Sequence, residues 1–257
     1  MNPLARTILV TGAGSGLGRG LGAWLAQRGH TILATDLQFA AAQETAAQIV
    51  AAGGRGGAFA LDVTSEESIA GLLSALGETR VDVLINNAGL QYVAGIEEYP
   101  VEKWDLLMSV MMKGTFLMSR AVLPGMRARN FGRIIHIGSI HSLIGSPYKS
   151  AYTAAKHALL GFSKVLALET GGAEITSNTI CPGYIRTPLV DAQIAGQART
   201  RGISEDEVID TVMLAPMPKK AFIAIEEVAA AVDYLMSPLA RNVTGQALAI
   251  DGGWTAQ

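Results

Sequence analysis

The chain has 257 residues, within the range of one large α/β domain, and 49% of them are hydrophobic, enough for a sizeable core. The formal net charge of −2, with both signs mixed, gives no argument for a nucleic acid or an anionic membrane as a partner. One cysteine, Cys181, excludes a disulfide framework and fits a reducing compartment. The start MNPLARTILVTG lacks the long apolar stretch of a signal peptide, and no uninterrupted apolar run has the length of a membrane span. We therefore expect a soluble, cytoplasmic protein.

Short apolar runs alternate along the chain with longer amphipathic stretches. The runs predicted as strands are Thr7–Val10, Thr31–Thr35, Gly57–Leu61, Val81–Ile85, Arg133–Ile137, Ile175–Ile180 and Ala247–Ile250. The stretches predicted as helices are Gly16–Arg28, Ala40–Ala52, Glu66–Leu76, Val101–Met112, Thr115–Ala128, Ala151–Glu169 and Glu226–Met236. Alternating strands and helices imply right-handed crossovers, and uniformly apolar strands fit a sheet that is buried on both faces. The pattern predicts an α/β fold: a Rossmann-type doubly wound parallel sheet, helices on both faces, as a single domain over residues 1–257.

One stretch, from residue 187 to about residue 224, has no clear periodicity. It is polar at first and then contains Pro216 and Pro218, and it lies between the last two predicted strands. An irregular segment of this length inside a compact domain is often a functional loop. We predict a mobile substrate lid at about 187–224.

The sequence TGAGSGLG, Thr11 to Gly18, follows the first strand and opens the first helix. Glycines at such a turn let the backbone approach a pyrophosphate at the helix N-terminus, although a glycine-rich turn alone can also be a tight connection. Asp36 ends the second strand, where a carboxylate can accept hydrogen bonds from ribose hydroxyls. No Arg or Lys occupies positions 13–15 or 37, so nothing there would pair with a 2′-phosphate. These features favour NAD over NADP. Asp62 is predicted, on weaker grounds, to contact the adenine.

Tyr152 and Lys156 are four residues apart on a predicted helix and therefore share one face. A free tyrosine has a pKa near ~10, and a nearby ammonium favours the phenolate and lowers that pKa. Ser139, at the end of the preceding strand, can donate a hydrogen bond to a substrate oxygen beside Tyr152. The Tyr-x-x-x-Lys pair alone is common on helix surfaces. Its place after a nucleotide-binding turn and a strand-end serine favours hydride transfer between a nicotinamide and a hydroxyl or carbonyl group.

These motifs, with Asn86-Asn87-Ala88-Gly89, Pro182-Gly183 and Asp251-Gly252-Gly253, resemble the short-chain dehydrogenase/reductase family over the whole chain. The resemblance implies Ser139 as the substrate-orienting donor, Tyr152 as the acid/base, and Lys156 as its tuner and a ribose ligand. It places Thr187 at the nicotinamide carboxamide and implies no metal. The residues expected at the cofactor are Gly12, Ser15, Gly16, Leu17, Gly18, Asp36, Asp62, Val63, Asn87, Ala88, Gly89, Tyr152, Lys156, Pro182, Gly183 and Thr187.

Met111 departs from the family pattern, because members usually carry a catalytic asparagine at this position. That asparagine helps to hold a water that links the lysine to bulk solvent, and a thioether cannot make the hydrogen bonds of an amide. The main-chain carbonyl of Met111 can still hold the water. The change puts the efficiency of the proton relay in question without excluding hydride transfer.

Longer segments, such as NNAGLQYVAGIEEYPVEKWD and ICPGYIRTPLV, resemble the D-3-hydroxybutyrate dehydrogenases within the family. The resemblance implies that the substrate carboxylate is held by Gln91, His141, Lys149 and Gln193, next to Ser139 and Tyr152. Amide, imidazole and ammonium donors suit a small anion, although each of these residues also has an ordinary structural interpretation. Tyr184 replaces a tryptophan of those enzymes, which leaves longer or branched 3-hydroxy acids possible.

The resemblance therefore predicts reversible NAD-dependent oxidation of (R)-3-hydroxybutyrate, or a close 3-hydroxy acid, as in ketone body metabolism. The first alternative is a short-chain dehydrogenase for another substrate, such as a 3-oxoacyl thioester or a sugar. The second is a dinucleotide-binding protein without turnover, which Met111 alone favours. The family also implies a homotetramer, with apolar helix faces and the Trp254 tail at its interfaces.

Overall fold

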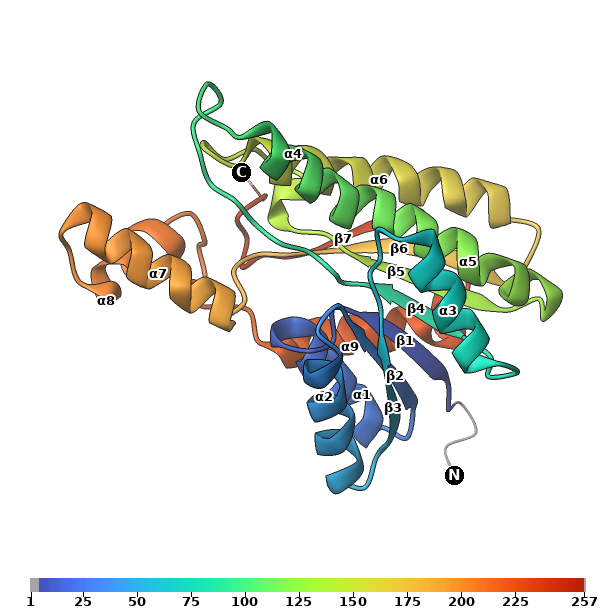
Figure 1. Ribbon diagram of the computed structural model, residues 1–257. Helices are drawn as coiled ribbons and strands as arrows, with labels where there is room; N and C mark the ends of the chain where they lie inside the picture. The colour runs from blue at the N-terminus through green and yellow to red at the C-terminus, as the bar shows by residue number, and fades with distance from the viewer. Residues whose placement is uncertain (1–4, 257) are drawn as a thin grey trace.

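The computed structural model describes the backbone of residues 5–256 and the side chains in that range except those at positions 188, 189, 192 and 200. These residues form a seven-stranded sheet in which every neighbouring pair is parallel, in the order β3-β2-β1-β4-β5-β6-β7 (Figure 1). The strands are β1 Thr7–Thr11, β2 Thr31–Asp36, β3 Arg55–Ala60, β4 Val83–Asn86, β5 Gly132–Ile137, β6 Ile175–Pro182 and β7 Ala247–Ile250. The predicted Rossmann-type fold is confirmed.

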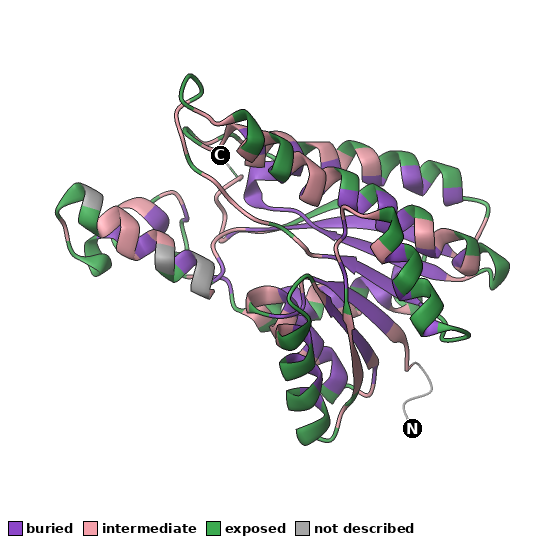
Figure 2. Ribbon diagram, viewed as in Figure 1, coloured by how far each residue is buried: buried purple, intermediate pink, exposed green. Residues whose placement is uncertain are grey.

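Helices cover both faces of the sheet (Figure 1). On one face lie α1 Gly16–Gln27, α2 Phe39–Ala51 and α9 Ile225–Met236, and on the other α3 Glu66–Leu76, α4 Val101–Met108, α5 Gly114–Ala128 and α6 Ser150–Thr170. Alternate residues of β1 enter separate apolar cores, because successive side chains of a strand point to opposite faces: Ile8 and Val10 pack with α1 and α9, and Leu9 with α3 and α5. The five inner strands are accordingly mostly buried, whereas the edge strands β3 and β7 are partly exposed (Figure 2).

Two strands, β3 and β4, begin at other residues than the sequence predicts. β3 begins at Arg55 rather than Gly57, and β4 begins at Val83 rather than Val81. Strand ends are fixed by pairing with neighbours, here Arg55 with Thr31 and Val83 with Ile8, and not by the apolar run itself. Local apolarity therefore located these strands but not their ends.

The segment between α4 and α5 continues the helix instead of breaking it. Residues Ser109–Lys113 form a π-helical turn, η1, which joins α4 and α5 into one helix from Val101 to Ala128. By length and composition this is the one helix in residues 5–256 that could cross a membrane, but 44% of its most apolar window is buried inside the protein. Its partners are the sheet, α3 and α6, so it is a core helix of the fold.

The expected irregular stretch after Thr187 is helical, and that part of the prediction was wrong. It contains α7 Pro188–Arg201, α8 Glu205–Val208 and the π-helical turn η3 Ile209–Met213, which project from the body of the molecule (Figure 1). Thr187 caps α7 through the Val190 amide, and Ser204 forms a capping box with Glu207. Residues of these helices pack with each other in a small apolar cluster of Val190, Ile194, Val208 and Met213. Movement of this lobe as a lid stays a prediction.

Candidate active site

A cavity of about 450 Å³ opens at the carboxyl ends of the strands, where β1 and β4 lie side by side but are separated in sequence by β2 and β3. The chain leaves these two strands in opposite directions along the sheet, and this topological switch point is where ligands bind in open α/β sheets. Most of the predicted site residues line this one cavity. They are Gly12, Ser15, Gly16, Leu17, Gly18, Asp36, Asn87, Ala88, Gly89, Gln91, Ser139, His141, Lys149, Tyr152, Lys156, Pro182, Gly183, Thr187 and Gln193.

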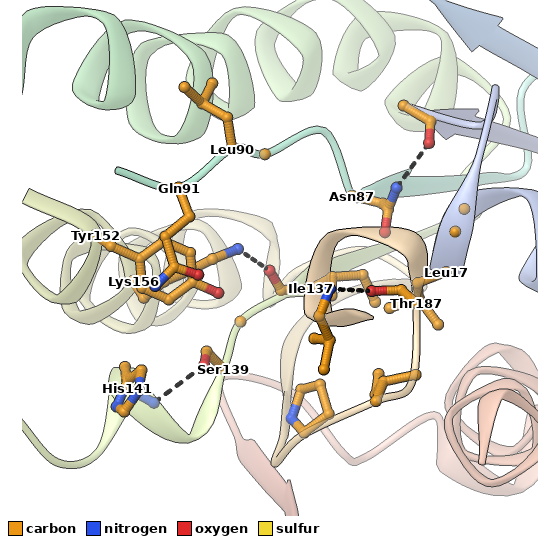
Figure 3. A pocket seen from close by; sticks show the side chains of 18 of the residues that line it. Leu17, Asn87, Leu90, Gln91, Ile137, Ser139, His141, Tyr152, Lys156 and Thr187 are labelled. Carbon is orange, nitrogen blue, oxygen red and sulfur yellow. Dashed lines mark hydrogen bonds between the residues drawn. The ribbon is translucent and has the colours of Figure 1, made fainter. Parts of the chain in front are cut away.

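The glycine turn after β1 lines the cavity with main-chain atoms, because Gly12, Gly16 and Gly18 have no side chains. Gly12 and Gly16 have φ of 64° and 51°, which favours glycine at both positions. A Cβ on Gly18 would lie 2.3 Å from the Gly12 carbonyl oxygen, so a side chain there cannot fit. The Asn87 amide donates to the Thr11 and Gly12 carbonyls at 2.9 and 3.1 Å, which fastens β4 to the turn (Figure 3).

The N-terminus of α1 faces this turn and carries no competing group. Its N-cap residue, Ser15, makes no side-chain hydrogen bond to the helix, and the first turn has no acidic residue. The backbone N–H groups at a helix N-terminus lack intrahelical partners and attract anions. Together with the side-chain-free glycine floor, this end of the cavity fits the pyrophosphate of a dinucleotide.

Asp36 is held at the end of β2 with its carboxylate beside the glycine turn. One oxygen accepts the Gly14 N–H and the other accepts the Gln38 N–H, both at 2.9 Å. Each oxygen keeps a lone pair for a further donor, as a ribose hydroxyl would supply. A side chain at Gly14 would collide with Asp36, since its Cβ would lie 2.7 Å from a carboxylate oxygen.

Ser139, Tyr152 and Lys156 converge at the centre of the cavity (Figure 3). Lys156 donates from Nζ to the Ile137 carbonyl at 2.6 Å, and its Nζ lies 5.6 Å from the centroid of the Tyr152 ring. Ser139 Oγ accepts the His141 N–H at 3.2 Å, which leaves its hydroxyl proton free to donate. Burial lowers the pKa of Lys156 to about 8, so at neutral pH this side chain is still mostly protonated.

The pKa of Tyr152 is raised in this structure, not lowered as the sequence suggested. Burial is the main cause and outweighs the opposite effect of the Ser139 hydroxyl. The Lys156 ammonium is engaged by the Ile137 carbonyl and lies beside the ring rather than at the phenol oxygen. Reaching the phenolate therefore requires positive charge from a ligand as well, which a bound oxidised nicotinamide would provide.

Met111 lies in the π-helical turn η1, buried at 1% exposure among Leu107, Ala151 and Ala155. Its carbonyl oxygen accepts the Thr115 hydroxyl at 2.7 Å, and a carbonyl oxygen has a second lone pair for a water. The thioether lies next to Gly89 at the cavity wall, since a Cβ added to Gly89 would lie 3.7 Å from the Met111 sulfur. The sulfur thus fills apolar space beside the site.

The four predicted carboxylate ligands line the cavity as two contacting pairs, Lys149 with His141 and Gln193 with Gln91. Lys149 Nζ lies 3.2 Å from His141 Nε2 and 3.4 Å from the Tyr184 hydroxyl. Gln193 on α7 donates to Gln91 at 2.9 Å, and the Gln91 amide nitrogen is buried without a partner among the described residues. Burial lowers the pKa of His141 to about 4, helped by the Lys149 charge, so this imidazole is neutral at pH 7.

Two expected cofactor residues, Asp62 and Val63, do not line the cavity. Asp62 accepts hydrogen bonds from the Thr64 backbone and hydroxyl, and Val63 is buried against α5, so contacts of this pair with an adenine stay a prediction. Trp254, which the sequence suggested for an interface, packs here on Tyr184 and His141 at centroid distances of 5.8 and 6.0 Å. Nothing local in the sequence signals that contact, because it joins the C-terminal tail to residues far away in the chain.

Comparison with known proteins agrees with this geometry. Residues 12–255 match the family model described as enoyl-(acyl carrier protein) reductase. The chain is 41% identical to a D-beta-hydroxybutyrate dehydrogenase of Rhizobium meliloti, over 99% of this chain and 100% of that protein. It is 39% identical to a D-beta-hydroxybutyrate dehydrogenase of Cupriavidus necator, and 34% identical to a 3-oxoacyl-(acyl-carrier-protein) reductase of Vibrio cholerae, each over 98% of both chains. The chain belongs to the short-chain dehydrogenase/reductase family and is an oxidoreductase that uses a nicotinamide dinucleotide.

Proposed function

We propose that the protein catalyses the reversible NAD-dependent oxidation of (R)-3-hydroxybutyrate, or a close 3-hydroxy acid, to the 3-oxo acid. The observation that carries the proposal is Lys149. Its ammonium lines the cavity, has lost part of its hydration, and contacts two uncharged groups, His141 and Tyr184. Among the described residues it forms no ion pair with a carboxylate within 4.0 Å. A partly buried cation without a counter-ion, in a cavity that two neutral amides also line, suits a small carboxylate ligand.

Burial lowers the pKa of Lys149, which is the cost of holding this charge without an anion. A bound carboxylate would offset that cost by pairing with the ammonium. Gln193 comes from α7, so a ligand gripped by both Gln91 and Gln193 would tie the helical lobe to the body of the protein. This supports the proposal that the segment at about 187–224 closes over the substrate.

In the proposed reaction, the Tyr152 phenolate accepts the hydroxyl proton of the substrate while the Ser139 hydroxyl donates to the same oxygen. NAD supplies the hydride acceptor and a positive ring. Lys156 provides a fixed positive charge near Tyr152 and a donor toward the ribose. The proposed carboxylate ligands orient C3, so anchoring contributes to rate through orientation as well as affinity.

NAD rather than NADP is proposed as the cofactor, because the Asp36 carboxylate projects into the cavity and would repel a 2′-phosphate. A homotetramer is proposed from exposed apolar side chains on two separate surfaces. One surface carries Leu106, Phe116, Val165 and Leu168 on α4, α5 and α6, and the other carries Tyr234, Leu239 and Leu248 near β7. Sedimentation velocity would measure the assembly. A cytoplasmic location stays a prediction.

The test of the proposed substrate is the acid-to-ester ratio of kcat/KM, measured by NADH absorbance. Lys149→Ala removes a charge-assisted hydrogen bond, typically about 1.5–3 kcal/mol, so kcat/KM for 3-hydroxybutyrate should fall by roughly tenfold to a hundredfold. The methyl ester has no anion, and its kcat/KM should change little. An unchanged ratio would remove the main support for a hydroxy-acid substrate. Turnover of a 3-oxoacyl thioester, but not of 3-hydroxybutyrate, would favour the reductase named among the relatives.

A further inference from the structure

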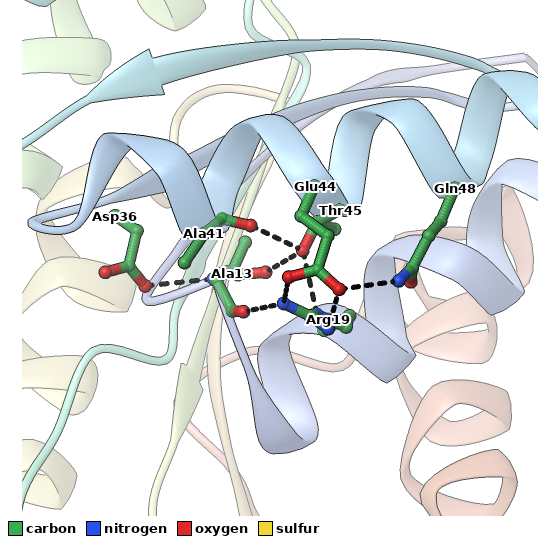
Figure 4. A network of polar contacts seen from close by, with 8 residues as sticks. Ala13, Arg19, Asp36, Ala41, Glu44, Thr45 and Gln48 are labelled. Carbon is green, nitrogen blue, oxygen red and sulfur yellow. Dashed lines mark hydrogen bonds and ion pairs between the residues drawn. The ribbon is translucent and has the colours of Figure 1, made fainter.

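A polar network lies under the glycine turn, outside the cavity, and its members come from α1 and α2 (Figure 4). Arg19 of α1 forms a two-pronged ion pair with Glu44 of α2, with nitrogen-to-oxygen distances of 3.1 and 3.0 Å. The same guanidinium donates to the Gly14 carbonyl and, through Nε, to the Thr45 hydroxyl at 3.1 Å. Thr45 in turn donates to the Ala13 carbonyl at 2.8 Å.

This network and Asp36 both hold Gly14, and the network also holds Ala13. Asp36 accepts the Gly14 N–H, whereas Arg19 and Thr45 donate to the Gly14 and Ala13 carbonyls. The Arg19 guanidinium and the Asp36 carboxylate therefore bind the same residue, Gly14, and Asp36 is the group proposed to face the adenosine ribose. An arginine in that position would suit a 2′-phosphate, because its planar fork binds phosphate in a bidentate manner.

Glu44 prevents that use of Arg19. It occupies both prongs of the guanidinium, and Gln48 steadies the Glu44 carboxylate with a hydrogen bond of 3.1 Å. It also cancels the arginine charge, so that Arg19, Asp36 and Glu44 together carry one net negative charge beside the turn. The pair is partly exposed, with 28% of the Arg19 side chain and 57% of the Glu44 side chain accessible, whereas the buried residues of α2 are Ala42, Thr45, Ala46 and Ile49.

We propose that Glu44 is a second determinant of cofactor choice, which retains and neutralises Arg19 so that the site discriminates against a 2′-phosphate. The proposal rests on the proposed preference for NAD and adds a residue outside the cavity to the role of Asp36. It implies that a single neutral substitution on α2 relaxes the preference without altering any residue that lines the site.

The test is calorimetric titration of NAD and NADP into the protein without substrate, for wild type and Glu44→Gln. The dissociation constant of NADP should fall by about threefold to tenfold, as expected for releasing one partly exposed charge near a dianion. The dissociation constant of NAD should change by less than about twofold. Adding Arg19→Ala to Glu44→Gln should abolish the gain for NADP, because the gain comes from the freed guanidinium.

Glu174→Gln is the matched control, since Glu174 forms a comparable exposed pair with Arg241 at 3.1 Å, at the amino end of β6. It should leave the ratio of the two dissociation constants unchanged. If Glu44→Gln weakens both cofactors equally, the pair only braces the turn and the proposal is overturned. If wild type binds NADP as tightly as NAD, the proposed cofactor preference itself fails, which is a different result.

Discussion

The surroundings of Tyr152 determine how readily this residue can accept or donate a proton. Its side chain is half-buried and lines the cavity with Ser139 and Tyr184, and the loss of hydration there raises its pKa. A tyrosine in such a place stays protonated at neutral pH, and the phenolate forms only when positive charge is brought near it. Lys156, with its pKa lowered to about 8 by burial, supplies part of that charge at neutral pH. In the proposed reaction the Tyr152 ring moves the proton, and Lys156 together with a bound oxidised nicotinamide would supply the positive charge that offsets the effect of burial.

Tyr152→Phe keeps the ring and removes the proton carrier. Turnover should fall by at least about a hundredfold, since a positioned acid/base contributes roughly 10²–10⁴ in rate. The dissociation constant of NAD, measured by calorimetry, should stay within about threefold of wild type, because no backbone group of the glycine turn is touched. Lys156→Ala should weaken NAD binding as well, as expected for a ribose ligand. Near-normal turnover in the phenylalanine variant would exclude the assigned role.

At the scale of elements, the π-helical turn η1 carries Met111, the residue at which the sequence departs from the family pattern. The Met111 carbonyl is oriented by the Thr115 hydroxyl, a contact that does not depend on the side chain at position 111. The side chain instead packs with Leu107, Ala151 and Ala155. A relay through the carbonyl can therefore operate without the amide.

Met111→Asn should accordingly change kcat by less than about fivefold, since the carbonyl and not the side chain holds the water. It should lower the melting temperature, because a polar amide enters an apolar cluster. Met111→Leu is the matched control, which keeps apolar volume and should preserve both quantities. A wild type without turnover that Met111→Asn restores would instead identify a protein that has lost its activity.

The elements differ in how far their sequence predicts them. Strands such as Ile8–Val10 are apolar on both faces and are identified without a partner, and the glycine turn is identified because Gly12 and Gly18 have no sterically equivalent replacement. Helix α7 was missed because its apolar residues do not form one continuous stripe, and because it packs mainly within its own lobe and not on the sheet. Contacts between distant segments, such as Trp254 on His141, carry no local signal.

At the scale of the whole molecule, a buried polar chain runs along one face of the sheet and joins three central strands to the helices α5 and α6. Asn86 of β4 donates to Ser119 of α5 at 3.3 Å and lies 3.2 Å from Nδ1 of His136 on β5. His136 Nε2 lies 3.1 Å from Ser177 of β6, which is 2.9 Å from Ser163 of α6. The Asn86 amide is a donor, so His136 accepts at Nδ1 and donates at Nε2, as only a neutral imidazole can. The chain joins three strands and two helices through a histidine that must stay uncharged.

This requirement makes the stability of the fold depend on pH. Burial, with a smaller contribution from the Lys156 charge, lowers the pKa of His136 to about 3, whereas an unfolded histidine has a pKa of about 6.5. Between these values the unfolded chain binds a proton that the folded chain cannot bind. The contribution of the neutral His136 to the free energy of unfolding is therefore fully present above pH 6.5. It falls as the pH is lowered, by at most about 1.4 kcal/mol per pH unit.

His136→Asn keeps a donor and an acceptor but cannot take up a proton. The free energy of unfolding, measured with urea from pH 7 down to pH 4, should fall less steeply in this variant than in wild type. The difference in slope should approach, and not exceed, about 1.4 kcal/mol per pH unit. His157→Asn, which changes an exposed histidine on α6, is the control and should leave the slope as in wild type. Equal slopes for His136→Asn and wild type would mean that the folded protein accommodates a charged His136, and the buried polar chain would then not require the neutral imidazole inferred from its hydrogen bonds.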